Sequence, residues 1–388
     1  MESGLVMLQT AMPLLAVRLG ASWIMLGTIG WVAQAIRTPV CFTSGHLSER
    51  VGRPTINVPA AIICALMILT LSRAQSIWQI MLPYAIAMAA IGAFYPPLQA
   101  MIGDVSELGQ LRKNLGMFNV GWCVGGAIAA WIAGQVVGHG LSKLFYAGAA
   151  CCTLAAILIL TWRAKRVPHP NDFPPCEGGI EGGEEPQQAA GDDFGPLLLI
   201  SRMGHFVGFF GFSIVRILFP KLGITAFGWS EETVAKVVAV FLWGLAVGIL
   251  VANVSPWWRG KLWPQFLAQW AMLVCAVGVA LVCSPVFGSI RLPGVIGALF
   301  FVYGMAQSIS YTGALYYGLS SRKGKGTNTG IHETLVAAGS VSGCLIGGIV
   351  AQKISLMAPW VVLAGLAGVS MIATGVIWAR QSAARASS

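Results

Sequence analysis

The chain has 388 residues, of which 56% are hydrophobic and only 10% are charged, and its mean hydropathy is +0.75. An ordinary soluble domain carries about 25% charged residues, so this composition excludes a soluble globular protein. The net charge of +10 does not indicate nucleic-acid binding, because the basic residues lie mainly in short segments between apolar runs, as the positive-inside rule expects.

Twelve apolar runs of helix length follow one another along the chain. Continuous apolar runs without in–out alternation predict membrane-spanning helices rather than the strands of a barrel. The sequence therefore predicts an all-α integral membrane protein with about twelve transmembrane helices. The expected spans are 4–17, 23–42, 55–72, 77–102, 115–137, 143–162, 196–220, 232–254, 262–283, 293–318, 327–350 and 358–379.

One long polar stretch, residues 163–195, interrupts this series and holds seven of the fourteen acidic residues together with several prolines and glycines. Such a composition cannot bury a core and predicts a flexible linker. The predicted organisation is an N-terminal six-helix bundle (1–162), a cytoplasmic linker (163–195), a C-terminal six-helix bundle (196–379) and a cytoplasmic tail (380–388).

The distribution of basic residues predicts the orientation. With the linker in the cytoplasm, 14 of the 24 Lys and Arg residues lie on the cytoplasmic side, 6 lie outside and 4 lie within spans. This excess predicts a multi-pass protein of the inner (cytoplasmic) cell membrane with both termini in the cytoplasm.

The two halves carry a weak internal repeat. Small residues spaced by four, Gly121-x3-Gly125-x3-Ala129-Ala130, recur 218 positions later as Gly339-x3-Gly343-x3-Gly347-Gly348. Such spacing predicts close helix–helix approach, and parallel repeats of six helices occur in transporters.

The first span is shorter than its counterpart in the second half. Pro13 and Ser22 in the first half match Pro220 and Ser230 in the second, but only twelve residues precede Pro13. Seventeen residues of helix reach about 25 Å, less than a hydrocarbon core of about 30 Å. The comparison predicts an N-terminally truncated chain or a misassigned start.

A charged segment joins the second and third spans, Gly45-His-Leu-Ser-Glu-Arg-Val-Gly-Arg-Pro54, and it predicts a tight turn at the membrane surface. The pattern Gly-x-Leu-Ser-Glu-Arg-x-Gly-Arg resembles the signature loop of major facilitator superfamily transporters. That family usually has Asp at the position of Glu49 and a second basic residue at the position of Pro54.

The resemblance implies two six-helix bundles and a conformational latch in this loop. In the family the acidic residue faces the start of the eleventh helix, and the first arginine pairs with an acid at the end of the fourth. The alternative is a plain solvated turn. The implied latch residues are Gly45, Glu49, Arg50, Gly52, Arg53 and Asp104.

Charged side chains inside spans are costly and are therefore functional candidates. Arg37 in the second span and Glu333 in the eleventh, next to His332, would neutralise each other across the two halves and form an inner gate. The alternative is that Arg37 extends to the membrane surface.

Further candidates lie on one face of the seventh span, where Arg202, His205, Phe209 and Arg216 follow helical spacing. They would suit an anionic or polar substrate; alternatively, the two arginines extend to opposite membrane surfaces and His205 is a packing residue. Other residues that could line a central cavity, or could equally pack between helices, are Asn119, Gln307 and Tyr311.

These features predict a secondary active transporter that moves a small solute by alternating access. Proton coupling stays open, with Glu333 and His332 as its candidates. The rival interpretation is a transporter-like sensor or assembly protein that moves no solute. The sequence contains no nucleotide-binding loop, metal spacing or catalytic pair, so we expect no enzyme activity, cofactor, metal or nucleic-acid partner. The expected partners are a small-molecule substrate and the lipid bilayer, and the expected state is a monomer.

Overall fold

A computed structural model of the chain describes residues 1–104, 111–161, 195–255, 257–284, 292–320 and 325–386. The regular structure in these residues is helical, which confirms the all-α prediction. The helices are α1 (Glu2–Arg18), α2 (Trp23–Val51), α3 (Arg53–Leu71), α4 (Ile77–Asp104), α5 (Leu111–Val136) with the short η1 (Val137–His139), α6 (Leu141–Thr161), α7 (Gly195–Ser213), η3 (Ile214–Leu218), α8 (Phe219–Thr225), α9 (Glu231–Val254), α10 (Trp263–Cys283), α11 (Pro293–Ser320), α12 (Lys325–Lys353) and α13 (Ala358–Ala386).

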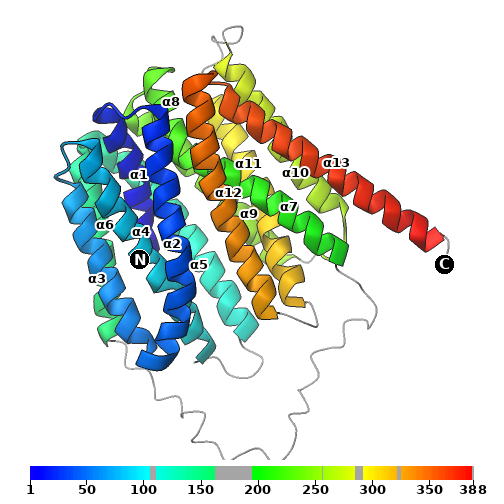
Figure 1. Cartoon of the computed structure of the whole chain (residues 1–388), viewed down its shortest axis with the longest axis horizontal. Coiled ribbons are helices and arrows are strands. Elements are labelled where there is room, and N and C mark those ends of the chain that lie inside the picture. The colour runs from blue at the N-terminus through cyan, green and yellow to red at the C-terminus, as the bar shows by residue number, and fades with distance from the viewer. Residues whose placement is uncertain (105–110, 162–194, 256, 285–291, 321–324, 387–388) are drawn as a thin grey trace, which may run out of the picture.

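The segments α7, η3 and α8 form one continuous rod, so the described residues contain twelve long helical rods, as predicted. They form two halves, α1–α6 and α7–α13, which lie side by side (Figure 1). Ten of the rods are long and apolar enough to cross a membrane. The two that miss these criteria are α1, which has 17 residues, and α2, whose second half is polar.

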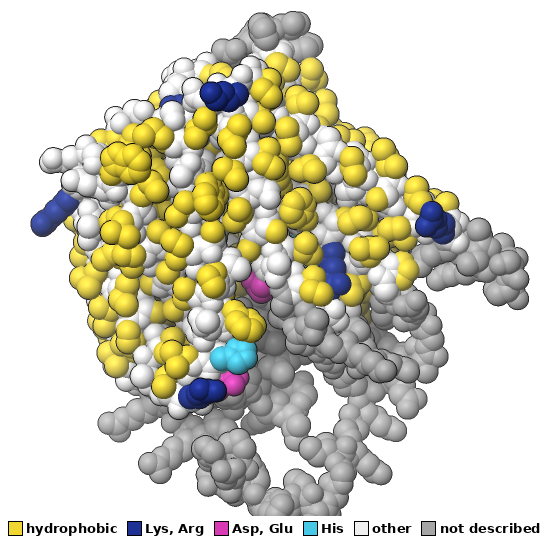
Figure 2. All heavy atoms as spheres, in the orientation of Figure 1, with side chains coloured by type: hydrophobic (Ala, Val, Ile, Leu, Met, Phe, Trp, Pro, Cys, Tyr) yellow, Lys and Arg dark blue, Asp and Glu magenta, His cyan; other side chains and the backbone are white. Residues whose placement is uncertain are grey.

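The surface and the interior are both apolar. Large hydrophobic side chains such as Phe42, Trp78 and Ile372 are about 70% exposed, and hydrophobic side chains cover most of the face in Figure 2. A water-soluble protein rarely exposes an apolar surface of this extent, whereas a protein surrounded by lipid does.

The predicted surface turn between the second and third spans is mostly helix, which corrects the sequence-based expectation. Helix α2 continues through residues 43–51, and its serine hydroxyls donate back to main-chain carbonyls, Ser44 to Cys41 at 3.2 Å and Ser48 to Gly45 at 2.7 Å. Gly52, at φ +92°, ends the helix in a conformation that side chains with a Cβ avoid. The turn is thus reduced to one glycine, and the predicted tail from residue 380 is likewise helical to Ala386.

The repeated glycines pack differently in the two halves. A Cβ on Gly339 or Gly343 of α12 would lie 2.7 or 2.2 Å from main-chain oxygens of α7, so the predicted close approach is confirmed there. A Cβ on Gly121 or Gly125 of α5 would meet nothing within 4 Å, so the prediction is wrong for α5.

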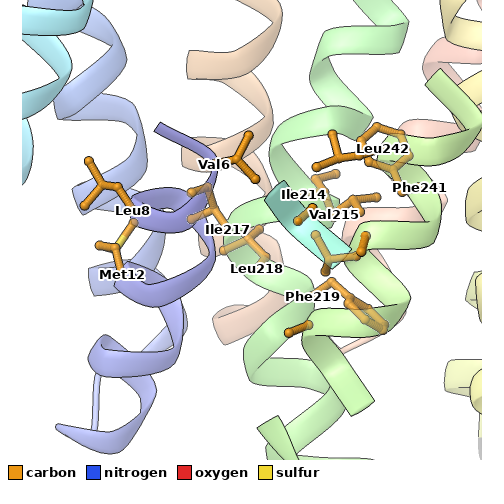
Figure 3. Packing of buried hydrophobic residues seen from close by; sticks show 14 of the residues in the cluster. Val6, Leu8, Met12, Ile214, Val215, Ile217, Leu218, Phe219, Phe241 and Leu242 are labelled. Carbon is orange, nitrogen blue, oxygen red and sulfur yellow. The ribbon is translucent and has the colours of Figure 1, made fainter. Parts of the chain in front are cut away.

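The two halves meet mainly where α2 packs against α12 and α5 against α9, and α1 also packs against η3 and α8 of the rod α7–η3–α8. Figure 3 shows Val6 of α1 beside Ile217 and Leu218 of η3, and these side chains belong to the main hydrophobic core. The segment η3 is π-helical, a form that occurs mostly as single turns within α-helices and frequently at functional sites. This packing places the middle residue of η3, Arg216, in the interior, beside the start of α1.

Candidate functional site

Polar contacts between the halves gather at the end of the bundle where α1 ends, which we call the closed end. Arg18 holds the carboxylate of Glu231 with two bonds, Nε to Oε1 at 2.5 Å and Nη2 to Oε2 at 2.7 Å. Lys221 of α8 donates to the main-chain oxygen of Ala21, which lies between α1 and α2. These contacts tie the connection between α1 and α2 to the second half.

Helices α2 and α12 cross at very close range near the same end. A Cβ on Gly27 would lie 2.4 Å from the carbonyl oxygen of Cys344, and a Cβ on Gly348 would lie 2.7 Å from that of Trp23. The Cβ position of Gly30 is 2.6 Å from the Cys344 sulfur. Only glycine permits this approach of two helix backbones, so the crossing is a tightly fitted contact between the halves.

Toward the opposite end, which we call the linker end, Figure 2 shows a hollow between the halves with an acidic side chain inside it. Glu333 of α12 is accessible to solvent although protein surrounds it on most sides, as expected for a side chain that lines a cavity. Arg37 of α2 is the charged side chain that interacts electrostatically with it. The structure thus brings together the two members of the predicted gate, but it shows no ion pair between them within 4 Å.

A second acidic side chain belongs to this interface, and the sequence analysis missed it. Glu2 at the start of α1 accepts a hydrogen bond from the hydroxyl of Tyr95 in α4 and lies beside Gly126 of α5. Arg216 and Arg37 both interact with its charge. The expected first span began at residue 4, so Glu2 was not counted among the charged side chains within spans.

The predicted stripe on the seventh span is divided between two environments. Arg202 lies toward the linker end, where its Nη2 donates to Oδ1 of Asn328 in α12 at 2.8 Å. Arg216 is only 4% exposed and stacks on Phe212 with its Cζ 5.4 Å from the ring centre, so it does not extend to a membrane surface. Fourteen residues of helix separate these arginines by about 20 Å, so they do not form one site.

Between the two arginines lies an aromatic cluster. The rings of His205 in α7 and His332 in α12 are stacked with centroids 4.3 Å apart, and Tyr311 of α11 contacts both at 5.6 and 5.0 Å. Phe209 packs against His205 at 4.9 Å. The ring nitrogens of both histidines are buried without a protein partner, as are both amide atoms of Gln307. This cluster therefore holds several unused hydrogen-bonding groups.

The first half contributes to the same region through α5. Trp122 donates its Nε1–H to Oδ1 of Asn119 at 3.2 Å, and its ring meets Tyr311 edge-on with centroids 6.4 Å apart. Asn119 is thus engaged within its own helix, whereas Trp122 makes the contact with the second half.

The predicted latch lies at the linker end of α2. Glu49 and Arg50 are exposed, whereas Arg53 donates from Nη1 to the hydroxyl of Ser48 at 2.7 Å and thereby joins α3 to α2. The side chain of Asp104 lies outside the described residues, so its pairing with Arg50 stays a prediction. Among the predicted latch residues, Gly52 ends α2 and Arg53 connects α3 to α2, while their action as a latch stays a prediction.

Several solved structures of membrane transporters have a similar shape. A bacterial homologue of the human lysosomal transporter Spinster, in an inward-facing and occupied conformation, superposes with a TM-score of 0.67, at 16% sequence identity over 98% of this chain and 92% of that chain. The nucleoside transporter NupG gives a TM-score of 0.63 (14% identity, 97% and 98% covered), and the human organic anion transporter MFSD10 gives 0.61 (15% identity, 96% of both chains). At these identities the likeness shows the fold.

The family itself is shown by sequence. No curated protein is similar enough in sequence to match the chain. The family model of the Major Facilitator Superfamily, however, matches residues 3–331, which is most of the chain and extends from the first half into the start of α12 in the second half. Together with the twelve helical rods, this match establishes that the chain belongs to the Major Facilitator Superfamily of membrane transporters.

Proposed function

We propose that this chain is a secondary transporter that carries a small solute across a membrane by alternating access. The observation that carries the proposal is the asymmetry between its two ends. The halves are joined by an ion pair and closely fitted glycines at the closed end, whereas Figure 2 shows a hollow between them, with an acidic side chain inside it, toward the linker end. A molecule open at one end and sealed at the other is one of the two states that alternating access requires.

The orientation follows from the basic residues. If the linker end faces the cytoplasm, as the charge distribution predicts, the present state opens inward and the closed end faces outward. Exposed Glu49 and Arg50 then belong to a latch that is released in this state, and the outward-open state would dock it onto the start of α12.

Proton coupling is part of the proposal because two carboxylates, Glu2 and Glu333, face the boundary between the halves near arginines. Intramembrane ionisable residues of this kind mark ion pathways. The structural neighbours include a nucleoside transporter and an organic anion transporter, so they indicate no common substrate for this chain.

The test uses the full chain reconstituted into vesicles. Uptake of labelled monocarboxylates, nucleosides, sugars and amino acids is measured with and without an imposed pH gradient, for the wild type and for Glu333→Gln. We expect at least one solute to accumulate, and coupling through Glu333 predicts that its accumulation loses its response to pH in the variant. If no solute moves under any condition, the rival sensor or assembly function is favoured.

A disulfide across the closed end tests alternating access directly. Gly30→Cys places a second sulfur beside native Cys344, and oxidation would then join α2 to α12. Transport should stop on oxidation and return with a reductant. The matched controls are Gly30→Ser, which adds a side chain of similar size, and Gly30→Cys with Cys344→Ser, which removes the partner thiol. Continued transport by the oxidised, cross-linked protein would refute the mechanism.

A further inference from the structure

The guanidinium of Arg216 is a buried group with unused donors. Arg216 is 4% exposed at the centre of η3, and its Nε and Nη2 have no hydrogen-bond partner. Among the described residues it has no ion-pair partner within 4 Å. A buried cation whose donors are unused is costly, so its retention in the interior calls for a function.

The unused donors lie on one edge of the guanidinium. Nε and Nη2 point in the same direction, and they form the edge that takes a carboxylate with two parallel bonds. This chain provides an example at Arg18, which holds Glu231 through Nε and Nη2. Arg216 thus presents, in the interior, the same pair of donors that Arg18 uses to hold Glu231 at the closed end.

Glu2 is the nearby countercharge, although it does not occupy this edge. Its carboxylate lies across the boundary between the halves, where it accepts from Tyr95 and interacts electrostatically with Arg216. Glu2 is only part-buried, whereas the two unused donors of Arg216 are fully buried, so a bound carboxylate would have to displace the side chains that now cover this edge.

We propose, building on the transport function above, that the Nε and Nη2 edge of Arg216 binds a carboxylate of the transported solute, and that this binding accompanies protonation of Glu2. When the Glu2 carboxylate takes a proton from water, it loses the negative charge that interacts with Arg216. The carboxylate of the incoming solute then supplies a negative charge beside Arg216 in its place. One proton and one anionic group enter together, so the net charge of the site is unchanged.

The charged and titratable groups around Glu2 come from several helices packed near the start of α1. Two of them are arginine cations, and most of the others are phenols and thiols. They are Arg37 on α2, Tyr84 and Tyr95 on α4, Cys123 on α5, Cys151 and Cys152 on α6, Arg216 on η3 and the amino terminus of the chain.

The test measures binding by the purified full chain in lipid nanodiscs. The probes are lactate, benzoate and octanoate, each compared with its amide, and the readout is thermal stabilisation as a function of concentration at pH 5.5 and pH 8.0. We expect at least one carboxylate to bind at least tenfold more tightly at pH 5.5 than at pH 8.0, and its amide to give no stabilisation.

Three variants separate the roles. Arg216→Lys keeps the charge but lacks the two-donor edge, so the carboxylate should bind at least tenfold more weakly. Glu2→Gln imitates the protonated acid, so binding at pH 8.0 should come within threefold of that at pH 5.5. Lys143→Gln removes an exposed cation of α6 and should change neither value.

Each opposite outcome overturns the proposal: no probe binds, an amide binds as well as its acid, Arg216→Lys binds as tightly as the wild type, or Glu2→Gln retains the pH response. If Arg216→Lys does not fold, the response of Glu2→Gln decides. Vesicle transport distinguishes failure of this proposal from failure of the transport function. If another solute is transported but no carboxylate binds, the anion site is refuted and the transport function stands. If a carboxylate binds but no solute is transported, the transport function is refuted and the anion site stands.

Discussion

The crossing of α2 and α12 at Gly27 should decide how firmly the closed end is sealed. In Gly27→Ala the new Cβ would lie 2.4 Å from the Cys344 oxygen and 3.2 Å from the Gly348 Cα, whereas ordinary contact begins near 3.4 Å. Both neighbours are backbone atoms, which cannot rotate away as a side chain can. The two helices must therefore separate by up to about 1 Å, or the closed end must open.

The expected magnitude follows from the cost of overpacking, about 1–3 kcal/mol. Because the clash is between the halves, this cost falls on the state that is closed here and not on a state in which α2 and α12 have parted. The equilibrium should therefore shift toward opening at this end by about 5- to 150-fold.

The assay is labelling of Ala21→Cys, introduced into a cysteine-free background, by a thiol reagent that does not cross the membrane. Ala21 is fully buried between the halves at the closed end, so its labelling reports opening there. Replacing native Cys344 leaves the clash intact, because the clash involves its main-chain oxygen. Gly27→Ala should increase the labelling rate, as should Gly348→Ala, whose Cβ would lie 2.7 Å from the Trp23 oxygen.

The matched control is Gly125→Ala, a helical glycine whose Cβ would meet no atom within 4 Å, and it should label like the parent. A folded, monodisperse Gly27→Ala that labels within twofold of the parent would show that this crossing does not seal the closed end. Faster labelling of Gly125→Ala to the same extent would show that the effect is not specific to the crossing.

Three further predictions use the same preparations. Arg18→Gln should raise the labelling of the closed end by no more than about fivefold, since a partly exposed ion pair contributes at most about 1 kcal/mol; a larger rise would mean that this pair dominates the seal. Arg37→Glu should impair transport and Glu333→Arg should restore it, and absence of rescue would count against coupling between these residues. Gly343→Ala, whose Cβ would lie 2.2 Å from a main-chain oxygen of α7, should lower the melting temperature by several degrees. Gly365→Ala, whose Cβ would meet no atom within 4 Å, should leave the melting temperature unchanged. Equal decreases in the melting temperatures of Gly343→Ala and Gly365→Ala would show that crowding at Gly343 is not the cause.

The helices were predictable because each one corresponds to a continuous apolar run in the sequence. The ends of the helices depend instead on individual hydrogen bonds and backbone conformations. The segment from Gly45 to Val51 looks like a loop by charge and glycine content. The hydroxyls of Ser44 and Ser48 donate hydrogen bonds to main-chain carbonyls of the preceding helical turn, so they do not interrupt the helix. Only Gly52 adopts a backbone conformation that ends it. Charge and glycine content alone therefore predicted the wrong local structure for this segment.

The interface residues were only partly predictable. Arg37 and Glu333 stand out because a charge inside an apolar run is visible in the sequence. Glu2 does not stand out, because it precedes the first apolar run, and its burial arises from neighbours on α4, α5 and η3. The π-helical turn at Arg216 likewise has no sequence signal that we recognise; it could be found only from the packing of α1 against the rod α7–η3–α8.

Two acid–arginine attractions span the boundary between the halves, and this arrangement bears on coupling. The first half contributes Glu2 and Arg37, and the second contributes Arg216 and Glu333. Glu2 is attracted to Arg216 and Glu333 to Arg37 across the boundary, while Glu2 is also attracted to Arg37 within its own half. Moving the halves apart weakens the two attractions that cross the boundary, in an interior where charges are poorly screened. A proton on either acid, or an anion on either arginine, changes that cost by altering the attractions in which that group takes part. Because a ligand shifts a conformational equilibrium only through its different affinity for the two states, these four side chains are where proton and solute binding would act on the rocking of the halves.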